Sequence, residues 1–194
     1  MKQKLKWLVI PIIVIVALLI AGLFYLNRKS TPVELELPIH NFKLNDEYVF
    51  DGIPWGTELQ EVKKKLPFPL EKIEMQGMVA AEKTELVDYR TVTQFILDGK
   101  ATSTATFKFQ NDKFVMAMLI FPLNQSDEAW YNTQLEKFIE HYGEASNIAE
   151  NSNENSAIKT YRWDTEMTSL QWGFMEKSNG TATATLAVFY RYQG

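Results

Sequence analysis

The sequence of 194 residues contains no cysteine and only two histidines. Without cysteine the chain forms no disulfide, offers no thiol nucleophile and supplies no thiolate ligand for a metal. The same absence excludes the lipid attachment of bacterial lipoproteins, which requires a cysteine. Any folded domain in this chain therefore depends on its hydrophobic core, and we expect it to hold no metal or other cofactor.

Motifs of several enzyme classes are also missing. The sequence has no glycine-rich phosphate loop and no Gly-x-Ser-x-Gly nucleophile elbow. His40 lies in an irregular polar stretch, and we interpret it as a surface residue. His141 falls in the last turn of a predicted helix, where a cation complements the helix dipole. Two histidines without further ligands do not form a zinc site, so we nominate no catalytic and no metal-binding residue.

The charge is unevenly distributed along the chain. The sequence has 20 basic and 24 acidic residues, a net charge of −4. The first 29 residues hold five of the basic ones and no acidic one, so the remainder carries 15 basic and 24 acidic residues, a net charge of −9. A domain this acidic is a poor partner for nucleic acid or for anionic lipid. We therefore expect no nucleic-acid partner.

The longest apolar stretch is residues 7–26, twenty residues without a charge. Twenty helical residues span about 30 Å, the thickness of the hydrocarbon core of a bilayer. Three lysines precede the stretch, and Arg28 and Lys29 come after it. Together with the amino terminus, the lysines outweigh these two later charges, which predicts a cytoplasmic N-terminus and an exported C-terminal part.

Two alternatives exist for this stretch: a cleaved signal peptide and a buried core helix. Signal peptides usually have an apolar core of about 7–15 residues and end in a small-x-small site. Here the apolar run is longer, and Ala21-Gly22 lies inside it without an Ala-x-Ala pattern. We predict an uncleaved anchor that crosses the lipid bilayer through residues 7–26, which makes the chain a single-pass membrane protein.

The remaining chain predicts an α+β fold. Residues 1–29 form the cytoplasmic tip and transmembrane anchor, and residues 30–47 a tether with a short edge strand. Residues 48–194 form the extracytoplasmic domain, in which an amphipathic helix followed by strands occurs twice, at about 48–123 and 126–194. We therefore predict an N-terminal transmembrane helix followed by two tandem helix-plus-antiparallel-sheet repeats.

The first predicted repeat opens with a helix over residues 58–66. Thr57 and Gln60 have the spacing of a capping box, in which each side chain bonds a free backbone N–H at the helix start. Leu59, Val62 and Leu66 fall on one face of this helix, which should pack against the core.

Strands should come after this helix. Asp98-Gly99 predicts a hairpin turn, because a two-residue turn needs positive φ at both positions. Beyond it, residues 101–110 alternate between apolar and polar side chains, which predicts one packed and one wet face. Residues 114–121 are apolar on both faces and predict a central strand covered on both sides. Residues 89–97 supply a partner strand, and residues 75–83 a further one.

The second predicted repeat has the same plan. Ser126 caps a helix that ends at Gly143, which suits a left-handed C-terminal position. Residues 144–157, rich in Asn, Ser and Glu, predict a solvated loop. Three strands come next, with Asn179-Gly180 as one hairpin turn, over residues 159–164, 167–175 and 181–192.

The run Phe-Asp-Gly-Ile-Pro-Trp-Gly-Thr at residues 50–57, followed by Glu61-Val62, resembles the opening of small exported or membrane-anchored domains of Gram-positive bacteria, most of them uncharacterised. Tyr142-Gly-Glu144 and Tyr161-Arg-Trp163 are similar to their second half. The arrangement also resembles the beta-lactamase-inhibitory-protein-like and outer-membrane-assembly-lipoprotein-like tandem repeat. Assembly lipoproteins need a lipidated cysteine that this chain lacks. The resemblance implies a module that contacts protein.

Two features suggest binding surfaces. Trp55 lies between a turn and a helix, where an aromatic ring can stack on a ligand, although packing against the helix is the alternative. Two groups of threonines alternate along predicted strands: Thr102, Thr104 and Thr106, and Thr181, Thr183 and Thr185. Flat threonine faces can bind a partner, but threonine is also simply favourable on a wet strand face.

Two hypotheses of function result. The first is a membrane-anchored, non-catalytic interaction module of the cell envelope, whose exposed sheet face or groove contacts a protein or another envelope component. The second is a small envelope hydrolase that uses a pair of carboxyl groups, for which the sequence nominates no residues. An exposed sheet with contiguous aromatic side chains favours the first, and a deep pocket with two carboxyl groups of raised pKa favours the second.

Overall fold

The computed structural model describes residues 33–73, 86–124 and 127–191. The predicted anchor at residues 7–26, the predicted strand at residues 75–83 and the predicted cap Ser126 lie outside these residues. Within the described residues, no helix combines the length and the apolar character needed to cross a bilayer.

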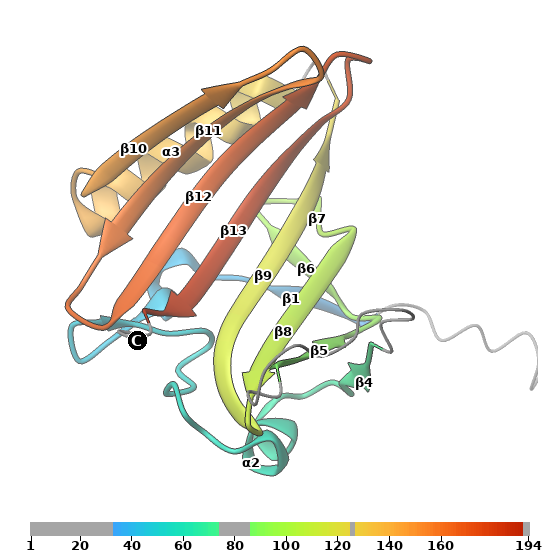
Figure 1. The fold of residues 1–194 in the computed structure, drawn as a ribbon, viewed down its shortest axis with the longest axis vertical. Helices are drawn as coiled ribbons and strands as arrows, with labels where there is room; N and C mark the ends of the chain where they lie inside the picture. Colours follow the sequence, from blue (N-terminus) through green and yellow to red (C-terminus); the bar gives the residue numbers. More distant parts are fainter. Residues whose placement is uncertain (1–32, 74–85, 125–126, 192–194) are drawn as a thin grey trace, which may run out of the picture. The chain divides into compact units, whose positions relative to one another are not determined.

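The fold is α+β and is built on one large antiparallel sheet (Figure 1). Its strand order is β10-β11-β12-β13-β9-β8-β5-β4. The four strands of the second half are β10 (Asn147–Ser152), β11 (Ser156–Asp164), β12 (Thr168–Lys177) and β13 (Ala182–Tyr190). Those of the first half are β4 (Glu71–Lys72), β5 (Leu86–Arg90), β8 (Thr104–Gln110) and β9 (Lys113–Leu123). The two halves meet where β13 pairs with β9.

One face of the sheet is covered by α3 (Glu128–Tyr142), which lies behind the sheet in Figure 1. The helix buries its apolar side against two tryptophans of the sheet. Phe138 packs against Trp163 and Trp172, with ring centroids 5.8 Å and 5.3 Å away. The helix ends at Gly143, as the sequence predicts; this glycine has φ +82° and ψ −172°, a positive-φ conformation that glycine adopts without strain, rather than the predicted left-handed helical one.

The N-terminal described segment extends the same core. β1 (Glu34–Glu36), the predicted edge strand, pairs in parallel with β6 (Gln94–Leu97), which also pairs with β7 (Lys100–Ala101). A 3-10 helix η1 (Ile39–Phe42) and a hairpin of β2 (Lys43–Leu44) and β3 (Glu47–Tyr48) come after β1. Phe50 and Phe95 both pack on Phe107 of β8, so these segments lie on the α3 side of the sheet.

The short helix α2 (Leu59–Lys65) buries Leu59 and Val62, as its amphipathic pattern predicts. The predicted capping box is wrong. Glu58 occupies the N-cap without a side-chain cap hydrogen bond, and the Thr57 hydroxyl instead donates to the carbonyl of Pro54 at 2.6 Å. The Thr57 hydroxyl therefore makes its hydrogen bond within the turn at residues 54–57, before the helix begins.

The structure corrects two strand predictions and one loop prediction. Residues 89–97 belong to two strands, β5 and β6, which lie in different sheets because the chain turns after Arg90. The strand predicted at residues 101–110 is interrupted between β7 and β8. Residues 144–157 are not a continuous loop, because β10 pairs with β11 over six residues. All six side chains of β10 are exposed, so no hydrophobic alternation marks this edge strand in the sequence.

Both predicted turns are present. Asp98 and Gly99 join β6 to β7 with φ values of +49° and +77°. Asn179-Gly180 lies in the turn between β12 and β13, where Gly180 has φ +79°.

Candidate functional site

The sheet has a second face, opposite α3, which we call the open face. On β8, β9 and β13 it carries the side chains that alternate with the buried core residues. In Figure 1 this face points toward the viewer, and no described helix or strand lies in front of β9 and β13.

Two of the predicted threonines lie on the open face, on the two sides of β9. Thr104 of β8 and Thr185 of β13 both pair with Ile120 of β9, from opposite sides. Thr183 lies one step along β13, paired with Pro122. The structure thus brings three of the six threonines, which come from both halves of the sequence, onto the two strands that flank β9.

The other predicted threonines do not form part of this exposed row. Thr102 is buried in the break between β7 and β8, where its hydroxyl oxygen accepts a hydrogen bond from the Phe95 N–H at 2.9 Å. The prediction of a wet Thr102 is therefore wrong. Thr106 has the orientation of the open face, but only 7% of it is exposed. Thr181 is exposed in the β12–β13 turn, where its hydroxyl donates to Asn179 Oδ1 at 2.7 Å.

Apolar side chains of β9 share the open face with the threonines. Partly exposed side chains alternate with buried ones along this strand. The partly exposed ones are Met116, Met118 and Ile120, and the buried ones are Ala117, Leu119 and Phe121. The prediction that this strand is covered on both sides is therefore wrong for the described part of the chain. An apolar row on an uncovered face is typical of a binding surface.

A pocket of about 680 Å³ lies at the end of the sheet beside Trp55, and we call it the Trp55 pocket. This volume is within the range of small-ligand sites, about 300–1,000 Å³. Its walls are largely apolar, formed by Leu44, Val49, Trp55, Val115, Met167 and Tyr190. Leu44 and Met167 are 42% and 45% exposed, which is high for large apolar side chains. Exposed apolar residues at the rim of an apolar pocket favour a binding role.

One hydrogen bond and one aromatic contact hold the Trp55 side chain in place. Its indole N–H donates to the carbonyl oxygen of Tyr48, and its ring packs on Phe114 with centroids 4.9 Å apart. The turn that presents it is tied to β9, because the Gly56 N–H donates to the Phe114 carbonyl at 2.9 Å. Trp55 therefore packs on the sheet, and its remaining surface forms part of the pocket wall.

The Trp55 pocket continues toward the open face. A smaller hollow of about 190 Å³ shares Gln110, Val115 and Tyr190 with it. The other walls of this hollow include Met116 and Phe189, which pair with each other across β9 and β13. Trp55 and the apolar row of β9 thus belong to one connected surface.

One acidic side chain in the pocket wall has a defined orientation. Glu47 Oε2 accepts hydrogen bonds from the hydroxyls of Thr165 and Thr168, the latter at 2.6 Å. Thr168 is itself fixed, because its hydroxyl oxygen accepts the Tyr48 N–H at 2.8 Å. Within the described residues, Glu47 Oε1 takes no hydrogen bond and no basic side chain forms an ion pair with Glu47.

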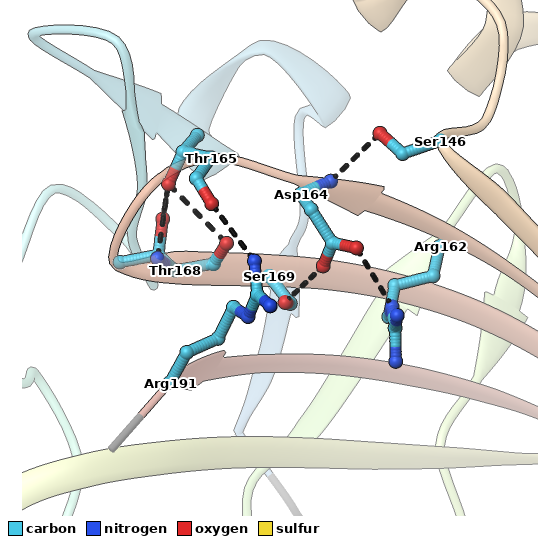
Figure 2. A network of polar contacts seen from close by, with 7 residues as sticks. All are labelled: Ser146, Arg162, Asp164, Thr165, Thr168, Ser169 and Arg191. Atoms are coloured by element: carbon cyan, nitrogen blue, oxygen red, sulfur yellow. Dashed lines mark hydrogen bonds and ion pairs between the residues drawn. The ribbon is translucent and has the colours of Figure 1, made fainter. Parts of the chain in front are cut away.

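A polar network surrounds the Thr165 turn (Figure 2). Asp164 accepts hydrogen bonds from the Arg162 guanidinium at 3.0 Å and from the buried Ser169 hydroxyl at 2.5 Å. Arg191 donates to the Thr165 carbonyl at 3.1 Å. Burial, and then the negative charge of Asp164, raise the pKa of the Tyr48 hydroxyl. The carboxylates of this region are thus held by hydroxyl and guanidinium donors.

The two histidines lie beside one hollow. His40 of η1 and His141 of α3 line it together with Glu140. His141 falls in the last turn of α3, as predicted. Across the described ranges, no three side chains of the metal-binding types lie close enough to hold an ion.

Comparison of the chain with protein-family models, with curated proteins and with solved structures gave no match. Sequence patterns had pointed to Trp55 and to the threonines, but not to Glu47 or to the pocket. Glu47 meets Thr165 and Thr168 across separations of 118 and 121 residues, and no local pattern carries that information.

Proposed function

We propose that this protein is a membrane-anchored interaction module of the cell envelope, non-catalytic, which binds a polypeptide partner on the open face of its sheet. The observation that carries the proposal is the partly exposed apolar row of Met116, Met118 and Ile120 beside Thr104 and Thr185. Apolar side chains of this size on an uncovered sheet face favour burial by a partner, because water-exposed apolar area is unfavourable.

The sequence supports the location. The uncharged stretch at residues 7–26 has the length of a transmembrane helix, and the charge bias around it favours export of the C-terminal part of the chain. The net charge of −9 beyond residue 29 disfavours nucleic acid and anionic lipid as the partner. We therefore propose that the open face lies outside the cytoplasm and that its ligand is a polypeptide of the cell envelope.

The order of the strands supports a tandem repeat. Each half consists of a helix followed by four strands of the large sheet, α2 before β4, β5, β8 and β9, and α3 before β10 to β13. The last strands of the two halves, β9 and β13, pair at the centre, and the first strands, β4 and β10, lie at the two edges. We infer that the β6–β7 hairpin is an insertion into the first copy. A repeat of this kind makes one continuous face from two units.

The alternative hypothesis of a small hydrolase requires two carboxyl groups that face each other and a substrate. Glu47 lines the pocket, and Asp164 lies in the polar network beside Thr168, another residue of the pocket wall. Each is bonded to hydroxyl groups, and Asp164 also to a guanidinium. These contacts favour a structural or ligand-orienting role over proton transfer, and we rank the interaction module first.

Site-specific photocrosslinking in intact envelopes tests the proposal. A photoreactive amino acid in place of Met118 should give a discrete adduct with a polypeptide. The same amino acid in place of Glu136, an exposed residue of α3 on the other side of the sheet, is the matched control and should not give that adduct. Identical adduct patterns at the two positions, or hydrolysis by the purified protein that depends on a carboxylate, would overturn the ranking.

A further inference from the structure

We infer that the Trp55 pocket binds a long basic side chain, lysine or arginine, of the partner polypeptide. The inference rests on the proposed function and names the chemistry of one part of the partner. Two features support it together: the apolar walls of the pocket and the acidic side chain in one of them.

The walls suit the stem of such a side chain. Leu44, Val49, Val115 and Met167 provide apolar surface, and Trp55 offers an aromatic ring in the same pocket. The aliphatic carbons of lysine and arginine pack on apolar surface while the charged end stays beside a polar group. A cation near the face of a tryptophan ring is also attracted by the ring quadrupole.

The negative charge in the pocket favours a side chain with a positively charged end group. Glu47 is an oriented carboxylate whose Oε2 is occupied by two threonine hydroxyls, while its Oε1 has no hydrogen-bond donor among the described residues. Lys113, the basic residue of the wall, is neutralised by Glu58 at 2.9 Å. That contact lowers the pKa of Glu58, first through the hydrogen bond and then through the charge of Lys113. Among the described residues of the wall, Glu47 is therefore the one charged side chain without an ion-pair partner, and its carboxylate is held in a fixed orientation.

The two hydroxyls prepare Glu47 for this role. Thr168 is 1% exposed and is bonded to the backbone of β3, so the carboxylate does not have to be ordered when a cation arrives. Binding groups that are oriented in advance lose less conformational freedom on association. A charge-assisted hydrogen bond between Oε1 and an ammonium or guanidinium group is the interaction that the geometry leaves open.

The test compares two short peptides that differ in one side chain. The first is acetyl-Gly-Ala-Lys-Ala-Gly-amide, and the second carries norleucine, which has a similar stem without the ammonium group. The full-length protein in detergent micelles, labelled with ¹³C in its methionine methyl groups, reports binding through Met167. We expect the lysine peptide to bind about tenfold more tightly, the effect of one charge-assisted hydrogen bond.

Three variants make the result specific. Glu47→Gln keeps an oxygen acceptor for the threonines and removes the charge, so it should abolish the preference for lysine. Leu44→Lys places a like charge at an exposed rim position and should weaken the lysine peptide while leaving the norleucine peptide unchanged. Glu150→Gln, on the edge strand β10, is the matched control and should retain the preference. An unfolding transition recorded for each variant identifies loss of binding through misfolding.

Equal affinity for the two peptides, or a lysine preference that survives in Glu47→Gln, would overturn the inference. That outcome would leave the proposed function in place if Met118 still crosslinks to a polypeptide. If the Met118 adduct is lost while the lysine preference persists, the open face is not the docking surface. The inference about the pocket would then still hold.

Discussion

Tyr131 of α3 stacks on Trp172 of β12 with ring centroids 5.3 Å apart and an interplanar angle of 10°. Among the described residues, neither the Tyr131 hydroxyl nor the Trp172 indole N–H has a hydrogen-bond partner, although both atoms are buried. Burial, and then the neighbouring Tyr161, raise the pKa of Tyr131. The aromatic contact therefore holds α3 to the sheet at the expense of two polar groups removed from water.

Replacing Tyr131 with phenylalanine should stabilise the protein. The ring stacking is kept and an unpaired buried hydroxyl is removed, so we expect the free energy of unfolding to rise by about 1 kcal/mol. Denaturant unfolding of the full-length chain in detergent measures the change. Tyr142→Phe is the matched control on the same helix, because the Tyr142 hydroxyl donates to the Ile39 carbonyl. That variant should lose stability, and a similar sign for both variants would contradict the assignment.

Neighbouring residues of β9 should respond in opposite ways to truncation. Leu119 is 1% exposed and faces the core, so Leu119→Ala should cost about 3 kcal/mol of unfolding free energy. Met118 faces the open side and is partly exposed, so Met118→Ala should cost less than about 1 kcal/mol. The same unfolding measurement compares the two. A large loss at Met118 would show that this face is covered in the intact protein and would remove the basis of the proposed docking surface.

Stability should depend on pH through Asp98. Hydrogen bonds from Lys137 and then from Gln134 lower the pKa of this carboxyl group below its usual value. A lowered pKa means that the carboxylate stabilises the folded state above the unfolded-state pKa of aspartate, about 3.9, and that this contribution is lost as the pH falls through the lower folded-state value.

Asp98→Asn is the variant that tests this dependence, since asparagine also tolerates the positive φ of +49° at this turn. The wild-type protein should unfold at a higher temperature than the variant at pH 7, and the two should converge below about pH 3. Thermal melts between about pH 7 and about pH 2.5 measure the difference. A gap that stays constant over this range would contradict a role for the ionised carboxyl group.

The predicted topology can be tested by labelling, because the chain has no cysteine of its own. Ser178→Cys, in the exposed turn between β12 and β13, should react with a membrane-impermeant maleimide in intact cells. Gln3→Cys should react only after the membrane is permeabilised. Labelling of Gln3→Cys but not of Ser178→Cys in intact cells would reverse the orientation, and a mature protein that begins near residue 30 would show that the leader is cleaved.

Local patterns predicted much of this fold. Asp98-Gly99 and Gly180 mark their turns because these positions need positive φ, which few residues adopt at low cost. The apolar positions of α3 and its end at Gly143 result from helical periodicity in the same way. Such features depend on residues within one or two turns of each other, so the sequence alone is sufficient.

Only the tertiary structure determines how these elements pack and pair with one another. Apolar residues on both sides of β9 predicted two covered faces, yet nothing in a strand's own sequence says whether an element will pack on its second side. The edge strand β10 was not predicted, because its exposed residues show no apolar pattern and pairing through the backbone needs no apolar side chain. Glu47, Thr165 and Thr168 meet only when the β2–β3 hairpin lies against the end of β12. Burial and site geometry depend on contacts between distant parts of the chain, and only the folded structure contains them.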